Sequence, residues 1–318
     1  MIVYVIQRLF YVVAIVVVMS VLVFAATHVL PGDTAVLILG QYATPDSLAA
    51  LRAKLGLNEP LPVQYWNWAW AFLHGDMGQS LVMERPVAPI VWAALKKSLV
   101  LAALAMACVT VFGITLGVVA AVWRGKPIDY AVSMFGYLGI SVPEFFWAII
   151  FVLLFAGALG WLPSSGYAII EEGFWPFVSH MIMPVVTLTL TLIAHVLRMT
   201  RSSMLEVLHS QYVKTARAKG LSERRVILRH ALPNGLLPTI TVLAFDFGWL
   251  IGGIVVIESV FAYPGVGRLL IYAMERHDLP LMQAIILITT IAFTLANLIA
   301  DLLYAFFNPR IRYGRAVD

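Results

Sequence analysis

The chain has 318 residues, of which 61% are hydrophobic and only 12% charged, and its formal net charge is +4. A soluble domain carries charge on about a quarter of its residues. This composition excludes a water-soluble globule, a disordered chain and a small disulfide-stapled protein, because those classes need more charge, fewer apolar residues or several cysteines. The single cysteine, Cys108, lies in an apolar run and is expected to act as a small hydrophobic residue. An integral membrane protein remains.

Six apolar segments are long enough to cross a bilayer, whose hydrocarbon core requires about 20 apolar residues of helix. In chain order they cover about 9–27, 98–123, 130–159, 180–197, 236–257 and 281–307. The first is longer than the apolar core of a cleaved secretion signal, so we expect a retained anchor. The sequence therefore predicts an all-α integral membrane protein with six transmembrane helices.

Basic residues are distributed unevenly between the two sides that six spans define. With the N-terminus inside, 14 Lys and Arg residues lie on the inner side and 7 on the outer side, five of these in one long loop. Positive charge favours the cytoplasmic side, and long loops count little in this rule. Both termini are therefore predicted to be cytoplasmic.

The long outer segment 31–97 is expected to be folded. Pro45 suits the first position of a helix that Gly56 can end. Five aromatic residues then fall within residues 65–72. Such a composition is typical of the lipid headgroup boundary, and an aromatic cage for a ligand is the alternative.

The inner segment between the fourth and fifth spans, residues 201–236, is the richest in charge. Leu205, Leu208 and Tyr212 recur at helical spacing, and we expect Ala216 to continue the same apolar face. The rest of this helix is polar. A helix with these two faces is predicted to project from the inner side of the membrane.

A tight turn is expected to follow this helix. Gly220 can end the helix in a left-handed conformation, and Ser222 can cap a second helix. Ala216, Ala218 and Gly220 are small, so another protein could approach this end closely. The rule that basic residues stay on the cytoplasmic side, binding of anionic lipid or binding of nucleic acid could each account for the basic charge here. None of the three requires small residues and a capped turn.

These residues resemble the EAA loop of ABC-importer permeases. In that pattern Glu-Ala-Ala and three further residues precede a glycine, and Ile-x-Leu-Pro follows after nine more. Here Thr215-Ala216 precede Gly220, and His230-Ala231-Leu232-Pro233 follow it. Lys214 stands in place of Glu, Thr215 in place of the first Ala and His230 in place of Ile. Residues 212–222 are closely similar to the variant in dipeptide and oligopeptide permeases of the B type.

Further motifs of that subfamily occur in the same order along the chain. They are Leu30-Pro31-Gly32-Asp33, 51–57, 73–80, 160–167 and 258–265. The chain is thus identified as a member of this permease family, and nickel and glutathione permeases share the pattern. The resemblance implies a type I ABC importer (MetI-like) permease fold with an extra-cytoplasmic loop domain after helix 1. We divide it into residues 1–97, the first helix with the outer loop, and 98–318, a five-helix core with the coupling loop.

The resemblance also implies a division of labour between subunits. The chain lacks a phosphate-cradling glycine loop, because Pro127 follows Gly125-Lys126 and no glycine lies five residues earlier. It is therefore expected to bind no cofactor and to catalyse no reaction, with ATP and Mg²⁺ bound by two partner ATP-binding subunits. A paralogous C-type permease would complete a heterodimer in the bacterial inner membrane. A periplasmic substrate-binding protein would deliver the cargo; lipid surrounds the chain and no nucleic acid is expected.

In such permeases the helix of this loop couples the membrane domain to the ATPase. The matching positions are Tyr212, Val213, Thr215, Ala216, Lys219, Gly220, Leu221 and Arg224. We expect Ala216 and Gly220 to set the depth at which the helix seats in the ATPase. A bulky β-branched residue at position 220 should then uncouple ATP hydrolysis from uptake.

Ionisable residues at membrane depth are costly and usually face a cavity or the bundle interior. Asp246 is therefore a candidate pathway residue, with a hydrogen-bonded structural carboxylate as the alternative. Glu144 follows a proline, where a kink could bring it to a pathway gate or only to a helix contact. Glu258 is a third candidate, although its place near a span end favours an interfacial position. His180 and His195 share one span without a second ligand pair, so no metal site is predicted.

Two other functional classes have less support. A self-sufficient secondary transporter needs coupling-ion carboxylates at mid-membrane and usually internal repeats, and here only Asp246 qualifies and no clear repeat is present. An intramembrane enzyme needs paired catalytic residues that the spans lack. Uptake that ignores ATP and follows an ion gradient would favour the secondary transporter.

Overall fold

The computed structural model describes residues 2–29, 36, 44–54 and 58–307. The helices up to the middle of the chain are α1 (Ile2–Val29), α3 (Pro45–Lys54), α4 (Leu61–Leu73), α5 (Val87–Val122), α6 (Pro127–Ser141), α7 (Glu144–Phe151) and the π-helical η2 (Val152–Ala158). The remaining ones are the 3₁₀ turn η3 (Ile170–Glu172), α8 (Phe174–Leu208), α9 (Gln211–Ala218), α10 (Glu223–Arg225), the π-helical η4 (Val226–Ala231), α11 (Leu232–Gly235), α12 (Leu237–Gly253), α13 (Val255–Val260), α14 (Val266–Glu275) and α15 (Leu279–Phe307). The motif at 30–33, the predicted stop at Gly56 and the basic residues of 308–318 lie outside the described residues.

Among the described residues, four helices are long and apolar enough to cross a membrane: Val5–Thr27, Val87–Val122, Phe174–Leu208 and Leu279–Leu302. Two bent helix pairs pass the same test together, α6 with α7 and η2, and α10 to α11 with α12. Counting each bent pair as one span gives the six spans of the prediction. In the described ranges no residue belongs to a β-strand, apart from an isolated bridge between Gln79 and Pro86.

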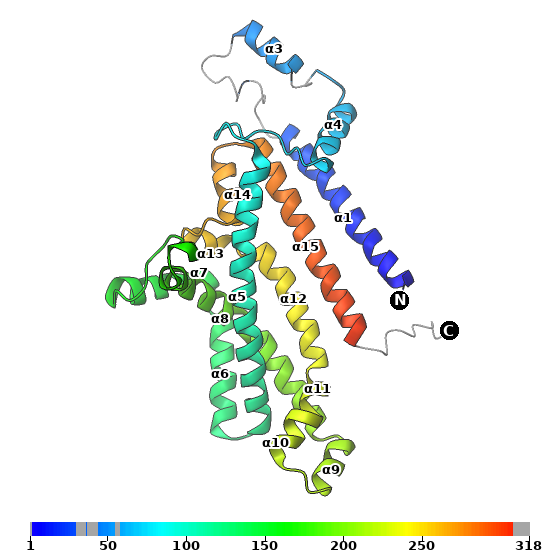
Figure 1. Cartoon of the computed structure of the whole chain (residues 1–318), viewed down its shortest axis with the longest axis vertical. Coiled ribbons are helices and arrows are strands. Elements are labelled where there is room, and N and C mark those ends of the chain that lie inside the picture. Colours follow the sequence, from blue (N-terminus) through cyan, green and yellow to red (C-terminus); the bar gives the residue numbers. More distant parts are fainter. Residues whose placement is uncertain (1, 30–35, 37–43, 55–57, 308–318) are drawn as a thin grey trace.

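The third span is bent, as the proline within it predicted. The axis turns by 101° between α6 and the α7–η2 segment. Proline restricts the residue before it to extended backbone and lacks an N–H for the helix ladder, and Val142, which precedes Pro143, has φ −106° and ψ 130°. The chain therefore leaves the direction of α6 at this proline (Figure 1).

Two helices extend well beyond the apolar segments that predicted them. α5 begins at Val87 instead of Ser98, and α8 continues to Leu208 instead of ending at Leu197. Lysine and arginine are good helix formers, so a helix does not stop where its hydrocarbon-facing part stops. The division that we placed between residues 97 and 98 falls inside α5.

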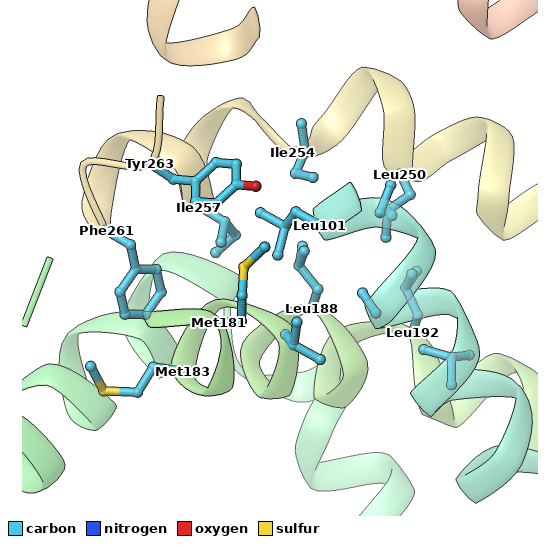
Figure 2. Packing of buried hydrophobic residues seen from close by; sticks show 14 of the residues in the cluster. Leu101, Met181, Met183, Leu188, Leu192, Leu250, Ile254, Ile257, Phe261 and Tyr263 are labelled. Atoms are coloured by element: carbon cyan, nitrogen blue, oxygen red, sulfur yellow. The ribbon is translucent and has the colours of Figure 1, made fainter. Parts of the chain in front are cut away.

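The centre of the bundle is the pair α5 and α8, which lie side by side (Figure 1). Two glycines of α5 permit this approach, since a Cβ atom would lie 2.7 Å from Val196 at Gly113 and 2.6 Å from Thr200 at Gly117. Figure 2 shows Leu101 of α5, Met181 of α8 and Ile257 of α13 pointing toward one another in the largest apolar core. α12 contributes Leu250 to the same core.

The two ends of the bundle carry different structures (Figure 1). We call the end with α9 and α10 the inner end and the end with α3 and α4 the outer end, after the predicted orientation. α1 packs on α15, where Arg8 and Asp301 form an ion pair of 3.0 Å. At the outer end α4 packs on α1, and Tyr65 of α4 shares a hydrogen bond of 2.8 Å with Ser20 of α1.

Candidate functional site

The connection between α8 and α12 forms a compact unit at the inner end, which we call the inner module (residues 211–235, α9 to α11). α8 ends at Leu208, and Ser210 takes the extended backbone of a residue that precedes a helix. Serine favours this position over a helix interior. The single apolar face expected through Leu205, Leu208 and Tyr212 is therefore wrong, because the first two belong to α8 and Tyr212 to α9.

The buried face of α9 rests on an apolar cluster of its own chain. Val213 has no exposed surface, and Ala216 is 6% exposed. The buried residues around them are Ala121 of α5, Met204 and Leu208 of α8, and Val226 and Ala231 of η4, with Leu221 packed alongside. Ala216 thus packs against its own chain, and its role in setting the depth of a partner's seat stays a prediction. Through this cluster α9 is connected to both central helices.

The opposite face of α9 is exposed and polar. Tyr212 is 44% exposed, and its hydroxyl oxygen accepts a hydrogen bond of 3.1 Å from Asn234 Nδ2. Thr215 and Lys219 follow at helical spacing and are exposed. Lys219 and the exposed Arg224 form no ion pair within the described part of the chain. The face therefore presents uncompensated positive charge.

The turn after α9 is left-handed, as predicted. Gly220 has φ +76°, and its N–H donates to the Arg217 carbonyl oxygen at 2.9 Å. A Cβ atom at this position would meet no atom of the chain within 4 Å, so the backbone conformation alone requires glycine. The expected side-chain cap by Ser222 is wrong: its side chain makes no cap hydrogen bond, and its carbonyl oxygen accepts from the Arg225 and Val226 N–H groups instead.

An ion pair that we did not predict closes the inner module. Arg217 Nη2 lies 2.6 Å from Glu223 Oε1, and Arg217 Nη1 donates to the Leu208 carbonyl oxygen at 3.3 Å. The hydrogen bonds to Glu223 raise the pKa of Arg217, so this guanidinium group stays charged. The sequence signal for this pair was the presence of opposite charges, Arg217 and Glu223, on the two sides of the Gly220 turn. The pair fixes α9 relative to α10 and to the end of α8.

Asp246 lies in α12 and is 7% exposed. Its Oδ1 atom is 3.2 Å from His195 Nδ1 of α8, and its buried Oδ2 atom has no hydrogen-bond partner in the part of the chain that the structure describes. We considered His195 only as a metal ligand and did not predict this contact. Among the described residues no group of three or more His, Cys, Asp and Glu is placed to hold a metal ion. The pathway role of Asp246 stays a prediction.

Glu144 is the first residue of α7, directly after the predicted kink. It is half-buried, and its Oε2 atom is buried without a hydrogen-bond partner among the described residues. The kink is confirmed by the 101° bend. Whether Glu144 reaches a gate stays a prediction.

Glu258 is buried near the end of α13. It has no exposed surface, and it accepts hydrogen bonds from Ser98 Oγ at 2.5 Å and from the Gly267 N–H at 2.7 Å. The side chain is thus a buried contact at the outer end, and its role in a pathway stays a prediction. Through these two hydrogen bonds Glu258 of α13 holds α5 and α14 together.

A second buried carboxylate at the outer end joins two other segments of the chain. Asp278 has no exposed surface and accepts hydrogen bonds from Ser80 Oγ, from the Leu81 N–H at 3.2 Å and from the Leu281 N–H at 3.3 Å. We call Glu258 and Asp278, with the donors around them, the outer clamps. Beside them, burial raises the pKa of Tyr263, whose hydroxyl donates to the Lys97 carbonyl oxygen at 2.8 Å.

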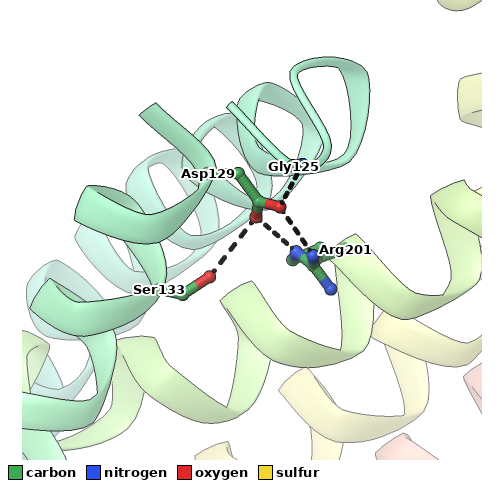
Figure 3. A network of polar contacts seen from close by, with 4 residues as sticks. All are labelled: Gly125, Asp129, Ser133 and Arg201. Carbon is green, nitrogen blue, oxygen red and sulfur yellow. Dashed lines mark hydrogen bonds and ion pairs between the residues drawn. The ribbon is translucent and has the colours of Figure 1, made fainter. Parts of the chain in front are cut away.

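A third polar cluster joins α6 to α8 near the inner end (Figure 3). Arg201 donates to both oxygens of Asp129, from Nε at 2.7 Å and from Nη2 at 2.8 Å. The Gly125 N–H donates to the same carboxylate at 2.9 Å. We counted Arg201 only as a basic residue of the inner side, because its partner lies 72 residues away in the sequence.

Comparison with protein families places this architecture in a known class. The family described as "Binding-protein-dependent transport system inner membrane component" matches residues 113–313, and "Binding-prot-dependent transport system membrane comp, N-term" matches residues 1–115. The chain belongs to this family of inner-membrane transport components.

Similar proteins narrow the class. The chain is 40% identical over 312 residues to the "Probable peptide ABC transporter permease protein y4tP" of Sinorhizobium fredii, covering 98% of this chain and 99% of that protein. It is 40% identical over 310 residues to the "Glutathione transport system permease protein GsiC" of Salmonella choleraesuis, with the same coverage. The protein is thus a multi-pass inner-membrane permease subunit of an ABC importer, a class that works with ATPase and substrate-binding components.

A solved structure supports the same fold. An inward-facing form of the MetNI methionine ABC transporter superimposes with a TM-score of 0.57 at 17% identity, covering 69% of this chain and 96% of that chain. A second crystal form gives a TM-score of 0.55. The type I importer permease fold is confirmed.

Proposed function

We propose that this chain is the peptide-translocating permease of an ATP-driven importer and that its inner module is the docking element for an ATPase subunit. Relatives named as peptide and glutathione permeases support peptides as the cargo class, since glutathione is itself a small peptide. ATP and Mg²⁺ bind to the ATPase subunits, and this chain hydrolyses nothing. Its partner in the membrane is a second, paralogous permease.

The observation that carries the proposal is the two-faced character of α9. Val213 and Ala216 fix the helix to its own chain, while Tyr212, Thr215 and Lys219 stay exposed at the inner end. A rigidly mounted helix with a free polar face is suited to contact a second protein. The positive charge on that face favours an acidic or polar groove as its seat.

The same mounting supplies a route for force. When ATP closes the two ATPase subunits, α9 moves with the subunit on which it is seated. The apolar cluster then transmits this displacement to α5 and α8, and the 53° bend between the α10–α11 segment and α12 conveys it to the fifth span. Such movement in both permeases opens the pathway toward the binding protein, and hydrolysis reverses it.

This mechanism requires the inner module to face the cytoplasm. The excess of Lys and Arg on the inner side supports that orientation, with both termini on the same side. α1 begins and α15 ends toward the inner end, which agrees with this arrangement (Figure 1).

Reconstitution tests the proposal directly. The complete importer is placed in proteoliposomes with its binding protein, and uptake of dipeptides, longer peptides, glutathione and nickel chelates is measured with and without ATP. We expect ATP-dependent uptake of peptides, abolished when the ATPase subunits carry a substitution that blocks hydrolysis. Uptake that persists with the blocked ATPase and follows an ion gradient would contradict the proposal. ATP-dependent uptake of nickel chelates alone would contradict the cargo class.

A further inference from the structure

A small cavity lies between α6 and α8 near the inner end of the bundle. Its volume is about 110 Å³, and it is lined from α6 by Ser133, Tyr137 and Ile140 and from α8 by His195, Arg198 and Arg201. Pockets that enclose whole small molecules usually measure about 300–1,000 Å³. This cavity therefore has room for one chemical group of a ligand whose remainder lies outside.

The polar lining of the cavity is mainly cationic. Arg201 uses Nε and Nη2 for Asp129, and its Nη1 atom makes no hydrogen bond within the described part of the chain. Arg198, one helical turn away, is exposed and has no ion pair there. Arg201 is thus paired with one buried carboxylate and Arg198 with none in the described residues, so the lining, which includes Tyr137, carries a net positive charge. An anionic group would be recognised at this place.

The level of the cavity in the membrane favours a lipid as the source of that group. The turn between α5 and α6 carries Trp123, with Lys126 Nζ 4.9 Å from its ring centre, a pair typical of the headgroup boundary. From this turn α6 enters the apolar zone, and Ile140 lies about 10 Å deeper than Ser133 at 1.5 Å per residue. The arginine end is thus near the headgroups.

The surface beside the cavity suits acyl chains. Met134 and Leu138 of α6 are 63% and 49% exposed and lie next to the cavity-lining positions of the same helix. His195, at the deep end, is already engaged by Asp246. A ligand with a charged head and an apolar body matches this order of surfaces, whereas a soluble anion would use only the charged end.

We propose that this cavity holds the phosphate group of an anionic phospholipid, with Arg198 and the free edge of Arg201 as its ligands and the acyl chains along α6. Basic pockets between transmembrane helices are suited to anionic headgroups. Because Arg201 also holds α6 to α8, the bound lipid would brace the helix pair next to the inner module. The inference does not depend on which protein docks at that module.

Native mass spectrometry of the complete importer tests the site. Phosphatidylglycerol and phosphatidylcholine with identical acyl chains are added to the delipidated complex, and the fraction of each that stays bound is measured. We expect clear preference for phosphatidylglycerol and about a fivefold loss of that preference in Arg198→Gln, given the modest attraction of one basic residue for an anionic lipid. Arg198→Lys should retain most of the preference, and its thermal stability should match that of the wild type.

Arg225→Gln is the matched control, because Arg225 is an exposed basic residue of the inner module and lies outside the cavity lining. Its lipid preference should equal that of the wild type. Equal binding of both lipids by the wild type, or an equal loss in both glutamine variants, would overturn the proposal. Displacement of the lipid by soluble glycerol phosphate would make a water-soluble anion the ligand. Cross-linking of Tyr137→Cys to the second permease instead of to lipid would make this face a protein interface.

Discussion

The two ends of this bundle use charge in opposite ways. At the outer end Glu258 and Asp278 are fully buried and accept hydrogen bonds from serine hydroxyls and backbone N–H groups. At the inner end α9 rests on apolar side chains such as Val213, and its basic residues stay exposed. Buried carboxyl groups hold the outer loops in place, whereas apolar packing is the main support of the inner module, with the Arg217–Glu223 pair at its surface.

The difference has an energetic reason. A buried carboxylate is costly to desolvate, so once formed it ties its donors to one geometry, and its removal leaves all of them unpaired. An apolar support needs no such pairing and leaves exposed charges such as those of Lys219 and Arg224 available to another protein. The outer clamps therefore suit a surface that stays fixed, and the inner module suits a surface that must be gripped and moved.

Removal of an outer clamp should have the largest effect on stability. Glu258→Ala leaves Ser98 Oγ and two backbone N–H groups without their acceptor, and we expect a loss of about 3 kcal/mol or more. Thermal unfolding of the purified protein in detergent measures it. The control is Glu275→Ala, at an exposed position of α14, which should change stability by less than about 0.5 kcal/mol. Equal unfolding temperatures for the two variants would show that Glu258 is no clamp.

A charge placed under α9 should have the next largest effect. Val213→Asp buries an unpaired carboxylate in the apolar cluster and should destabilise the inner module by about 3 kcal/mol at most, because the module can open locally. Limited proteolysis within residues 209–222 should become faster. Thr215→Asp, two residues along on the exposed face, is the matched variant and should digest like the wild type. If both variants digest alike, α9 does not rest on this cluster.

Strain at the turn should have a smaller structural effect and a clear functional one. Gly220→Val forces a β-branched residue to φ +76°, at a cost of about 1–3 kcal/mol. We expect the altered turn to misplace α9, so that ATP hydrolysis continues while uptake falls. Gly160→Val carries the same kind of strain at φ +62°, equally free of contacts, outside the inner module. Normal uptake by an assembled Gly220→Val complex would reject the role of this turn.

Removal of exposed charge should have the smallest effect on stability. The double variant Lys219→Gln and Arg224→Gln should unfold within about 0.5 kcal/mol of the wild type, because neither residue has an ion pair among the described residues. Its binding to the ATPase subunit should weaken and lose part of its salt dependence. Arg276→Gln, an exposed position at the other end, should leave binding unchanged. Unfolding at a much lower temperature would assign these charges to the fold.

Local chemistry made part of this structure predictable. Apolar runs located the spans, Pro143 located the bend, and turn chemistry located the left-handed Gly220. The break between α8 and α9 was missed because the apolar spacing continues across Ser210, although the helix does not. The expected ends of α5 and α8 were misplaced because charged residues mark where a helix leaves the hydrocarbon layer, not where the helix itself ends.

The polar contacts were beyond the reach of local patterns. The partners of Asp246, Asp129, Glu258 and Asp278 lie 51, 72, 160 and 198 residues away in the sequence. A single sequence shows that such a carboxylate is expensive at its depth, but not which distant donor compensates for it. This is why the sequence did not reveal that Glu258 holds Ser98 and Gly267 together.

The central claim is that the exposed face of α9 meets the ATPase, and site-directed cross-linking in the assembled importer tests it most directly. Single cysteines are placed at Thr215, Val213 and Arg276 in a Cys108→Ala background and treated with a short cross-linker, with and without ATP. The account predicts a cross-link to the ATPase subunit from Thr215→Cys that changes with ATP, and none from Val213→Cys or Arg276→Cys. No ATPase cross-link from Thr215→Cys in an intact, transporting complex, or an equal one from Arg276→Cys, would contradict it.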